Sequence, residues 1–263
     1  MKKGLFLLLL FCSLPISGQN QEIKILKLNS YFFEADDFLG HDKFGFRYFI
    51  INNTLNKQKD SLTLQYKNVS LGKIARVDLQ NPLKIVLFYE NFNTVVTLDN
   101  QLNETQKINF SAHPVPIVAA AIGMASQNRL WVYNSLSQQI GLFDYLKLDY
   151  KPLTVPFTGR LKFYEADFNY FHWIDDTLNR YTCDVYGKVS NLGKVPDFDH
   201  LQFLNSNWLL FSKDSRLYAY DVAGNKTHVL GIDEKTFKSF TAKDQILSIF
   251  TSEGITNYKI IIP

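Results

Sequence analysis

Cysteine and methionine are almost absent from this sequence, and each occurs only twice in 263 residues. Cys12 falls in an apolar N-terminal run, so Cys183 is the single cysteine in the rest of the chain. One cysteine cannot form an internal disulfide, so the fold must be stabilised by burial. With 46% hydrophobic and 15% aromatic residues, a chain of this length can build a large core of flat, stiff side chains.

The spacings that mark common metal and catalytic sites are also missing. No His-Glu-x-x-His, Cys-x-x-Cys or Gly-x-Ser-x-Gly motif occurs. The five histidines are scattered, with no two at metal-ligand spacing: His41, His113, His172, His200 and His228. We interpret each of them as a surface or strand residue, and we expect no enzyme active site, no metal and no cofactor.

A large excess of positive charge is absent as well. The chain has 28 Lys and Arg against 25 Asp and Glu, and loss of Lys2 and Lys3 with a leader would bring it closer to neutrality. Such a balanced chain lacks the electrostatic footprint of a nucleic-acid-binding protein. We therefore expect no nucleic acid among its partners.

One apolar run stands at the N-terminus, and no second run of comparable length follows. Two lysines precede residues 4–11 (GLFLLLLF), and small or helix-breaking residues separate this run from a polar stretch. This order of a positive start, an apolar run and a polar stretch is typical of a secretory signal peptide. The run is far short of the roughly 20 residues that span a bilayer, so a retained membrane anchor is less favoured. We predict a signal peptide over residues 1–18 and one domain over residues 19–263. The domain would be exported to the periplasm without direct membrane insertion.

Lipidation of the N-terminal cysteine is the less favoured interpretation. A lipid-modified cysteine normally follows a small residue, whereas Phe11 precedes Cys12, which lies at the end of the apolar run. We therefore expect a soluble periplasmic protein that reaches the outer membrane only through a partner.

The chain does contain an internal repeat. Strand-like segments closed by Asp recur at intervals of roughly 40 residues, at Asp99 (VTLD), Asp144 (GLFD), Asp184 (YTCD) and Asp221 (YAYD), with a degenerate copy (GITN) at Asn257. An apolar-aromatic strand precedes each copy, and a turn containing Gly or Asn follows Asp99, Asp184 and Asp221. Asp suits these turns because its carboxylate bonds the nearby backbone, and Gly accepts a positive φ.

This repeat predicts an all-β fold, a β-propeller of six four-stranded blades, because roughly 40 residues is the period of one blade. Five blades end near the copies above and one lies around residues 46–66, with five or seven blades as alternatives. The alanine-rich residues 117–124 are interpreted as an inner strand. Residues 22–28 alternate without a partner of their own, so we expect them to pair with the last strand, 258–263, and close the ring.

Three tryptophans recur at roughly the period of a blade: Trp131, Trp173 and Trp208. One interpretation makes them aromatic platforms for a sugar or a peptide, and we keep them as weak candidate binding residues. The alternative, which we favour, places them at equivalent packing positions inside the blades.

The densest polar cluster comprises Glu34, Asp36 and Asp37, followed closely by His41 and Asp42. A near copy, Glu-Ala-Asp, begins at residue 165. A calcium site or an acid/base pair is one hypothesis, but the Asp-x-Asp-x-Asp-Gly spacing of a calcium loop is missing. The favoured interpretation is a polar turn that precedes an inner strand in both places.

Two segments carry a family resemblance, residues 70–104 (SLGKIARVDLQNPLKIVLFYENFNTVVTLDNQLNE) and residues 35–40 (ADDFLG). They resemble a group of exported flavobacterial proteins to which the Plug proteins of the Bacteroidetes type 9 secretion translocon belong. The shared motifs are structural and carry over no contact residue. The resemblance implies a periplasmic protein that docks on the inner mouth of a very large outer-membrane barrel and blocks leakage.

Several classes of function are compatible with such a chain. A non-catalytic protein-binding module is favoured, because a propeller offers broad faces and the sequence shows no catalytic set. The alternative is a small-ligand or glycan binder, with a propeller hydrolase or lyase less favoured. Three or more Asp, Glu or His converging at the channel mouth would favour an enzyme. We expect a monomer with an outer-membrane protein partner, and no domain for onward secretion after the last strand.

Overall fold

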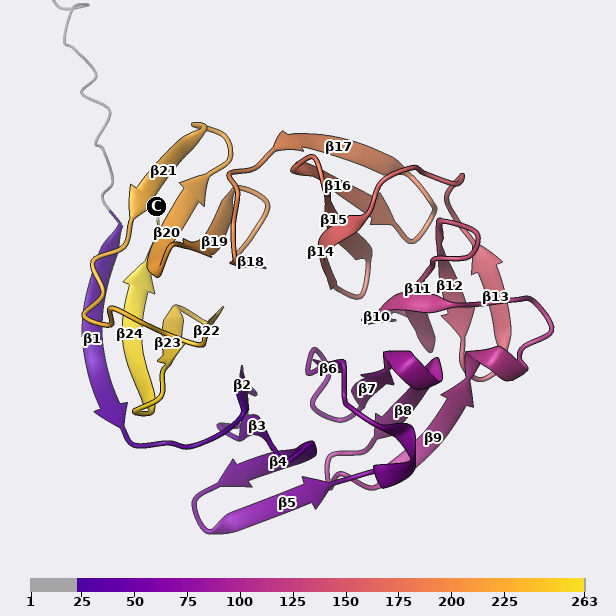
Figure 1. Cartoon of the computed structure of the whole chain (residues 1–263), viewed down its shortest axis with the longest axis horizontal. Helices are drawn as coiled ribbons and strands as arrows, with labels where there is room; N and C mark the ends of the chain where they lie inside the picture. Colours follow the sequence, from indigo (N-terminus) through magenta and orange to yellow (C-terminus); the bar gives the residue numbers. More distant parts are fainter. Residues whose placement is uncertain (1–22, 263) are drawn as a thin grey trace, which may run out of the picture.

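The computed structural model describes residues 23–262, which form six four-stranded antiparallel sheets arranged around a central axis (Figure 1). The predicted fold, a six-bladed propeller, is confirmed. The predicted signal peptide and Cys12 lie outside the described residues. Within residues 23–262, no helix is both long and apolar enough to cross a membrane.

The first three blades follow one another along the chain, and each runs from its inner to its outer strand. Their strands are β2 (Asp37–His41), β3 (Arg47–Ile51), β4 (Thr54–Lys59) and β5 (Leu62–Tyr66) in blade 1; β6 (Arg76–Asp78), β7 (Ile85–Tyr89), β8 (Thr94–Leu98) and β9 (Glu104–Asn109) in blade 2; and β10 (Ala119–Ala125), β11 (Arg129–Asn134), β12 (Gln139–Asp144) and β13 (Asp149–Pro152) in blade 3. The alanine-rich segment is the inner strand β10, as predicted.

The remaining blades repeat this order, except that the last takes its outer strand from the N-terminus. Their strands are β14 (Leu161–Ala166), β15 (Tyr170–Asp175), β16 (Asn179–Asp184) and β17 (Val189–Lys194) in blade 4; β18 (His200–Phe203), β19 (Trp208–Lys213), β20 (Arg216–Asp221) and β21 (Lys226–Val229) in blade 5; and β22 (Ser239–Lys243), β23 (Ile246–Phe250), β24 (Ile255–Ile261) and β1 (Lys24–Tyr31) in blade 6. The helical elements in the described chain are three 3₁₀ turns: η1 (Val69–Leu71), η2 (Glu90–Phe92) and η3 (Phe110–Ala112).

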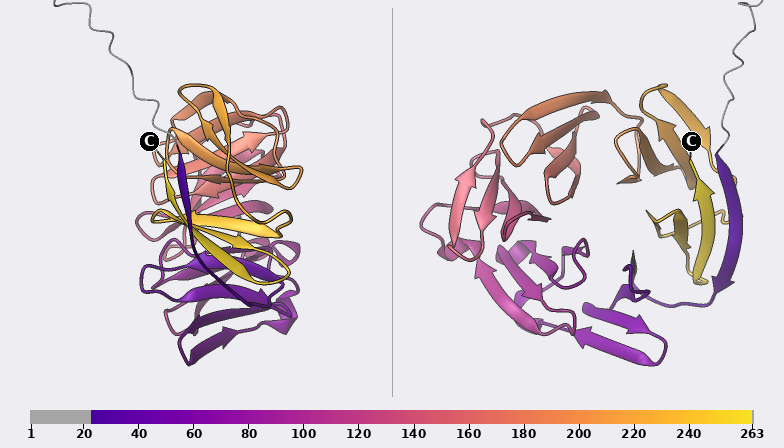
Figure 2. Two further views of the ribbon diagram at one scale, coloured as in Figure 1. Left: turned by 90° about the vertical axis from the view of Figure 1, so that its left-hand side faces the viewer. Right: turned by 180° about the vertical axis from the view of Figure 1, so that it is seen from behind.

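The N-terminal strand closes the ring. Strand β1 pairs antiparallel with β24, from Lys24 opposite Ile261 to Tyr31 opposite Ile255. The edge-on view in Figure 2 shows β1 crossing the outside of blade 6. This pairing covers the edge that β24 would otherwise expose, so the predicted closure is confirmed.

The repeated aspartates form the turns that the sequence predicted. The Asp184 carboxylate accepts hydrogen bonds from the backbone N–H groups of Tyr186 and Lys188, at 2.9 and 3.0 Å. The degenerate copy is wrong in register, however, because Asn257 lies inside β24 opposite Ser248 rather than at the end of the strand. The four-residue motif GITN alone could not show that Asn257 lies inside the strand, since register depends on cross-strand pairing.

Apolar side chains fill the space between neighbouring blades. Between blades 3 and 4, for example, Trp131, Phe171 and Cys183 are completely buried in one cluster.

The disc has two distinct faces, because successive strands of each blade are antiparallel and their connections alternate between the two ends of the blade. Face 1 carries the turns between the first and second strands and between the third and fourth strands of each blade. Face 2 carries the remaining turns and the connections between blades.

Candidate functional site

The inner strands place one residue of each blade at an equivalent position beside the central channel. Each of these residues pairs with the second strand of its blade near face 1: Gly40, Asp78, Gly123, Glu165, Gln202 and Thr241. All of them except the glycine of blade 3 line a cavity of about 310 Å³ in the channel. The channel is concave and polar side chains from several blades converge in it, so it is a candidate site.

Three of these side chains fasten their blade to the next one. Asp78 accepts a hydrogen bond from the backbone N–H of Met124 at 2.7 Å, and Glu165 accepts a long one from Phe203 at 3.4 Å. Gln202 binds both the N–H and the C=O of Ala242, at 2.7 Å each. The inner strands are sheet edges, so these bonds satisfy backbone groups that would otherwise lack partners. The first role of this polar ring is therefore structural.

Glu165 is the exceptional member of the ring. Burial raises the pKa of its carboxyl to about 7, and the nearby positive charge of Arg76 opposes that shift. The Glu165 side chain lines both the channel and a second pocket, so it links the two candidate sites.

Replacing Glu165 by Gln is expected to make the protein more stable at alkaline pH. Between pH 4.5 and about 7 the folded state binds a proton that the unfolded state has lost, so wild-type stability falls as the pH rises through this window. The variant should gain at most about 3 kcal/mol above pH 7, because water in the channel screens part of the shift. Urea unfolding at pH 5 and pH 8 measures this difference. The exposed Glu90→Gln is the control, and equal pH slopes for Glu165→Gln and wild type would contradict the prediction.

The second pocket lies at the face 1 end of the junction between blades 4 and 5, and its volume is about 510 Å³. Glu165, His172 and Thr182 form one cross-strand row on β14, β15 and β16, so their side chains share one face of blade 4. Blade 5 contributes Phe203 and the following turn. This row is polar, whereas the other side chains packed between blades 4 and 5 form an apolar cluster.

Asp167 and His172 form the one carboxylate–imidazole pair in this pocket. The His172 Nε2 lies 3.5 Å from the Asp167 carboxylate, while the buried Nδ1 has no hydrogen-bond partner. Two backbone N–H groups, from Asn169 and Tyr170, also bind the Asp167 carboxylate at 2.7 and 2.8 Å. Asp167 therefore lies in the turn after the inner strand. It does not precede that strand, so the proposed equivalence with the Glu34–Asp37 segment is wrong.

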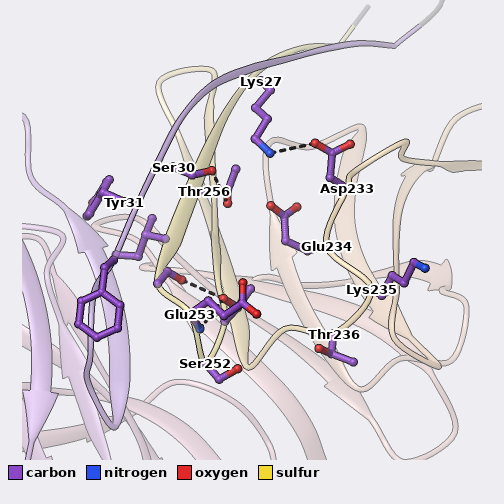
Figure 3. A pocket seen from close by; sticks show the side chains of 14 residues that line it. Lys27, Ser30, Tyr31, Asp233, Glu234, Lys235, Thr236, Ser252, Glu253 and Thr256 are labelled. Carbon is purple, nitrogen blue, oxygen red and sulfur yellow. Dashed lines mark hydrogen bonds and ion pairs between the residues drawn. The ribbon is translucent and has the colours of Figure 1, made fainter.

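A third cavity, of about 550 Å³, opens on face 2 beside the closing strand (Figure 3). Lys27 on β1 bonds Asp233 at 2.9 Å, and Ser30 lies 2.9 Å from the Thr256 hydroxyl of β24. The neighbouring Phe32 is 78% exposed. The contacts among these side chains attach β1 to blade 6 and to the segment that enters it.

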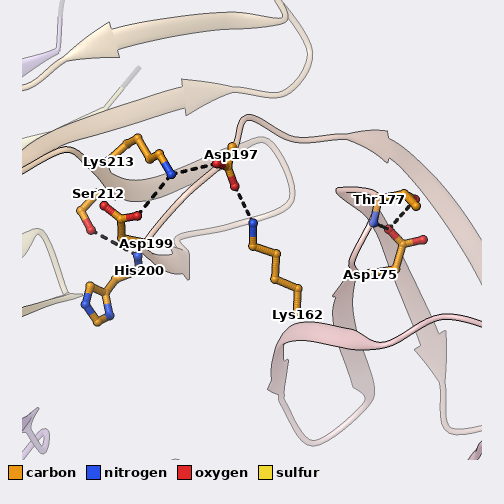
Figure 4. Close-up of polar contacts among 8 residues, drawn as sticks. All are labelled: Lys162, Asp175, Thr177, Asp197, Asp199, His200, Ser212 and Lys213. Carbon is orange, nitrogen blue, oxygen red and sulfur yellow. Dashed lines mark hydrogen bonds and ion pairs between the residues drawn. The ribbon is translucent and has the colours of Figure 1, made fainter.

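Face 2 also carries an exposed ion-pair cluster between blades 4 and 5 (Figure 4). Asp197 binds Lys162 of β14 and Lys213 of β19, and Lys213 also contacts Asp199 at 3.3 Å. Hydrogen bonds from the two lysines hold the pKa of the Asp197 carboxyl well below its ordinary value. Because the cluster is solvent-exposed, we assign it little stability and no binding role.

The three candidate tryptophans are not brought together. Trp131, Trp173 and Trp208 lie in β11, β15 and β19, and all three are buried. They also occupy different registers, since Trp208 begins its strand opposite Asp221 whereas Trp131 lies inside its strand opposite Leu142. A spacing close to the blade period therefore did not mean equivalent positions in the blades.

The candidate acidic cluster lies at the entry to blade 1. Glu34, Asp36 and Asp37 are exposed, and the Asp36 carboxylate accepts a hydrogen bond from the Asn52 N–H at 2.7 Å. Asp42 accepts bonds from two backbone N–H groups and from the Tyr48 hydroxyl. Across residues 23–262, no three His, Cys, Asp or Glu side chains are grouped so that they could hold a metal ion.

Three solved structures illustrate what this chain is similar to. A virginiamycin B lyase from Staphylococcus aureus aligns with a TM-score of 0.59 and 11% identity, over 91% of this chain and 100% of the lyase. A streptogramin B lyase aligns with a TM-score of 0.57 and 11% identity, over 91% and 98% of the two chains. PorZ, a surface component of the type-IX secretion system of Porphyromonas gingivalis, aligns with a TM-score of 0.47 and 11% identity, over 89% of this chain and 37% of PorZ.

At these identities the likeness shows the propeller fold alone, and the TM-score for PorZ is too low to support an argument. No protein-family model matches the chain, and no curated protein matches its sequence. The function must therefore be argued from the residues themselves.

Proposed function

We propose that this protein is a non-catalytic periplasmic binding module that docks on the type 9 translocon barrel through face 1 and seals it. The sequence resemblance over residues 70–104 supports the partner, and that segment corresponds to η1 and most of blade 2. One structural observation carries the docking surface: exposed aromatic rings are concentrated on face 1.

Four aromatic side chains that are at least 40% exposed lie in or beside turns of face 1: Phe44, Phe168, Tyr170 and Tyr186, with exposed fractions of 50, 41, 44 and 91%. Three of these four belong to blade 4. Face 2 has two such residues in the described chain, Phe32 and Phe92. Aromatic residues are enriched at protein interfaces, so their bias favours face 1 as the docking surface.

The central channel is compatible with a seal. The channel cavity has a volume of about 310 Å³ and is lined by inner-strand residues of several blades. The hydrogen bonds of Asp78, Glu165 and Gln202 keep neighbouring inner strands together around it. A disc closed in this way would stop large solutes, provided that its rim meets the barrel.

Catalysis is not part of this proposal. His41, Asp78 and Glu165 do line the channel, which is the number of groups that would favour an enzyme. Asp78, however, is occupied by the backbone N–H groups of Gln80 and Met124. Glu165 accepts a bond from the next blade, so both carboxylates already have a structural role that explains their presence in the channel.

Deletion of the gene is the test of the proposed function. Outer-membrane permeability to large antibiotics should rise while secretion continues, and the rise should vanish when the barrel is deleted as well. The intact protein should co-purify with the barrel from native membranes in mild detergent. Unchanged permeability together with no barrel in the purified complex would refute the proposal.

Complementation tests the docking face. A Phe168→Asp, Tyr186→Asp double variant should fail to restore the permeability barrier, because it places charge in the proposed interface. Phe92→Asp, on face 2, is the matched control and should complement fully. The reverse pattern would place docking on face 2, provided that all variants accumulate to the same level.

A further inference from the structure

The pocket between blades 4 and 5 contains a buried guanidinium group without a carboxylate partner. Arg180, in β16, is 3% exposed. Its Nη1 donates one hydrogen bond to the Ser206 carbonyl at 3.2 Å, and its buried Nε has no partner. The guanidinium carbon lies 4.9 Å from the centre of the Phe203 ring. No ion pair to Arg180 occurs within residues 23–262.

The propeller fold does not require a charge at this position. Arg180 pairs with Ile174, and the corresponding place in the third strand of the other five blades is apolar. Those five side chains are at most 1% exposed: Leu55, Val95, Ile140, Leu217 and Ile255. A buried, unpaired charge is costly, so its occurrence in one blade of six points to a role other than packing.

Other unsatisfied polar groups surround this arginine. The Thr182 hydroxyl and the His172 Nδ1 are buried without hydrogen-bond partners, and both residues line the same pocket. With the Arg180 Nε, they make three of the seven such atoms in the described chain. Since buried polar groups normally have partners, this concentration indicates a place where a polar ligand binds.

The charges of the pocket select the ligand. The Asp167 carboxylate lies 3.5 Å from the His172 ring, and the Glu165 carboxyl bonds the backbone of the neighbouring blade. Neither group forms an ion pair with Arg180 within residues 23–262, so the guanidinium can still take a carboxylate partner. Both carboxylates would repel a doubly charged phosphate, whereas a single carboxylate balances the guanidinium and can accept two of its hydrogen bonds.

The remaining lining sets the size and character of that ligand. The volume of about 510 Å³ falls within the range of small-molecule sites. Leu192, Phe203 and Leu204 add apolar surface. We propose that this pocket binds a small organic molecule with one carboxylate and an apolar side chain, and that the carboxylate pairs with Arg180. The proposal does not depend on docking to a barrel.

Binding of N-acetyl-leucine to the whole mature protein, measured by calorimetry and thermal shift at constant ionic strength, tests the proposal. N-acetyl-leucine should raise the melting temperature in a concentration-dependent way, and N-acetyl-leucinamide, which lacks the charge, should not. Inorganic phosphate should bind at least tenfold more weakly than the carboxylate. Equal shifts with acid and amide, or no shift with either, would overturn the proposal.

A peptide probe distinguishes the two sources of such a carboxylate. Acetyl-Ala-Ala-Leu with a free C-terminus should bind more tightly than N-acetyl-leucine if the natural ligand is a protein C-terminus. It should bind no more tightly if the ligand is a free small acid. Either result supports the carboxylate site, and the loss of binding on amidation of the peptide is required in both cases.

Arg180→Met separates binding from structure. The variant should bind N-acetyl-leucine at least tenfold more weakly, yet its melting temperature without ligand should be unchanged or higher, because it removes an unpaired buried charge. The exposed Arg216→Met is the matched control and should bind normally. If Arg180→Met fails to fold, Thr182→Val provides a second test. This variant should bind N-acetyl-leucine more weakly, and normal affinity would contradict the site.

Discussion

Removal of residues 24–31 is expected to open blade 6 and destabilise the whole propeller. Strand β1 supplies seven residue pairs to β24, and an antiparallel ladder has about one backbone hydrogen bond per pair. At about 1 kcal/mol net for each bond, the loss of β1 should lower the free energy of unfolding by roughly 7 kcal/mol. The exposed edge of β24 should also pair between molecules. Urea unfolding and light scattering measure the two effects.

The control for this deletion keeps the ladder intact. A chain that begins at residue 22 retains all of β1 and should be as stable as a chain that begins at residue 19. The closing role of β1 would be refuted if the protein without residues 24–31 stayed monomeric and unfolded at the same urea concentration.

Replacing Trp131 by Ala is expected to lower the free energy of unfolding by about 3–5 kcal/mol. The Trp131 side chain is completely buried between blades 3 and 4, and its Nε1 donates a hydrogen bond to the Asp167 carbonyl at 2.8 Å. The substitution therefore creates a cavity and leaves a carbonyl without its partner. The urea midpoint is the measurement.

Tyr186→Ala provides the comparison for the tryptophan variant. Tyr186 is 91% exposed, so its truncation should change stability by less than about 0.5 kcal/mol. Trp131 would be shown to be a binding platform, and not a core residue, if both variants were equally stable and only Trp131→Ala lost affinity for a ligand.

Much of the fold could be predicted from local sequence patterns. The aspartate turns after β12, β16 and β20 gave the period, because an Asp carboxylate bonds backbone groups two to four residues ahead wherever the chain reverses. Residues 22–28 alternate like a strand but have no partner strand next to them in the sequence. They therefore indicated the closing strand, since an unpaired strand edge needs a partner.

The candidate site was much less visible. Trp131 and Trp208 recur at the blade period but differ in register, and Glu34, Asp36 and Asp37 remain weak candidates on an exposed segment. An alignment of the blades by strand pairing, and not by residue type, would have singled out Arg180, because the equivalent residues of the other five blades are all apolar. That alignment requires the register of every sheet.

The sequence by itself determined most of the strands and their period, because turns and alternation depend on residues close together in the chain. It favoured six blades, and the structure decided that number over five or seven. Only the tertiary structure decided which side chains meet between blades. Glu165 accepts a hydrogen bond from the Phe203 backbone, and Arg180 lies against the Phe203 ring. Both contacts join blade 4 to blade 5. Such contacts depend on how neighbouring sheets are packed face to face, and burial between them gives an ordinary Glu or Arg its unusual environment.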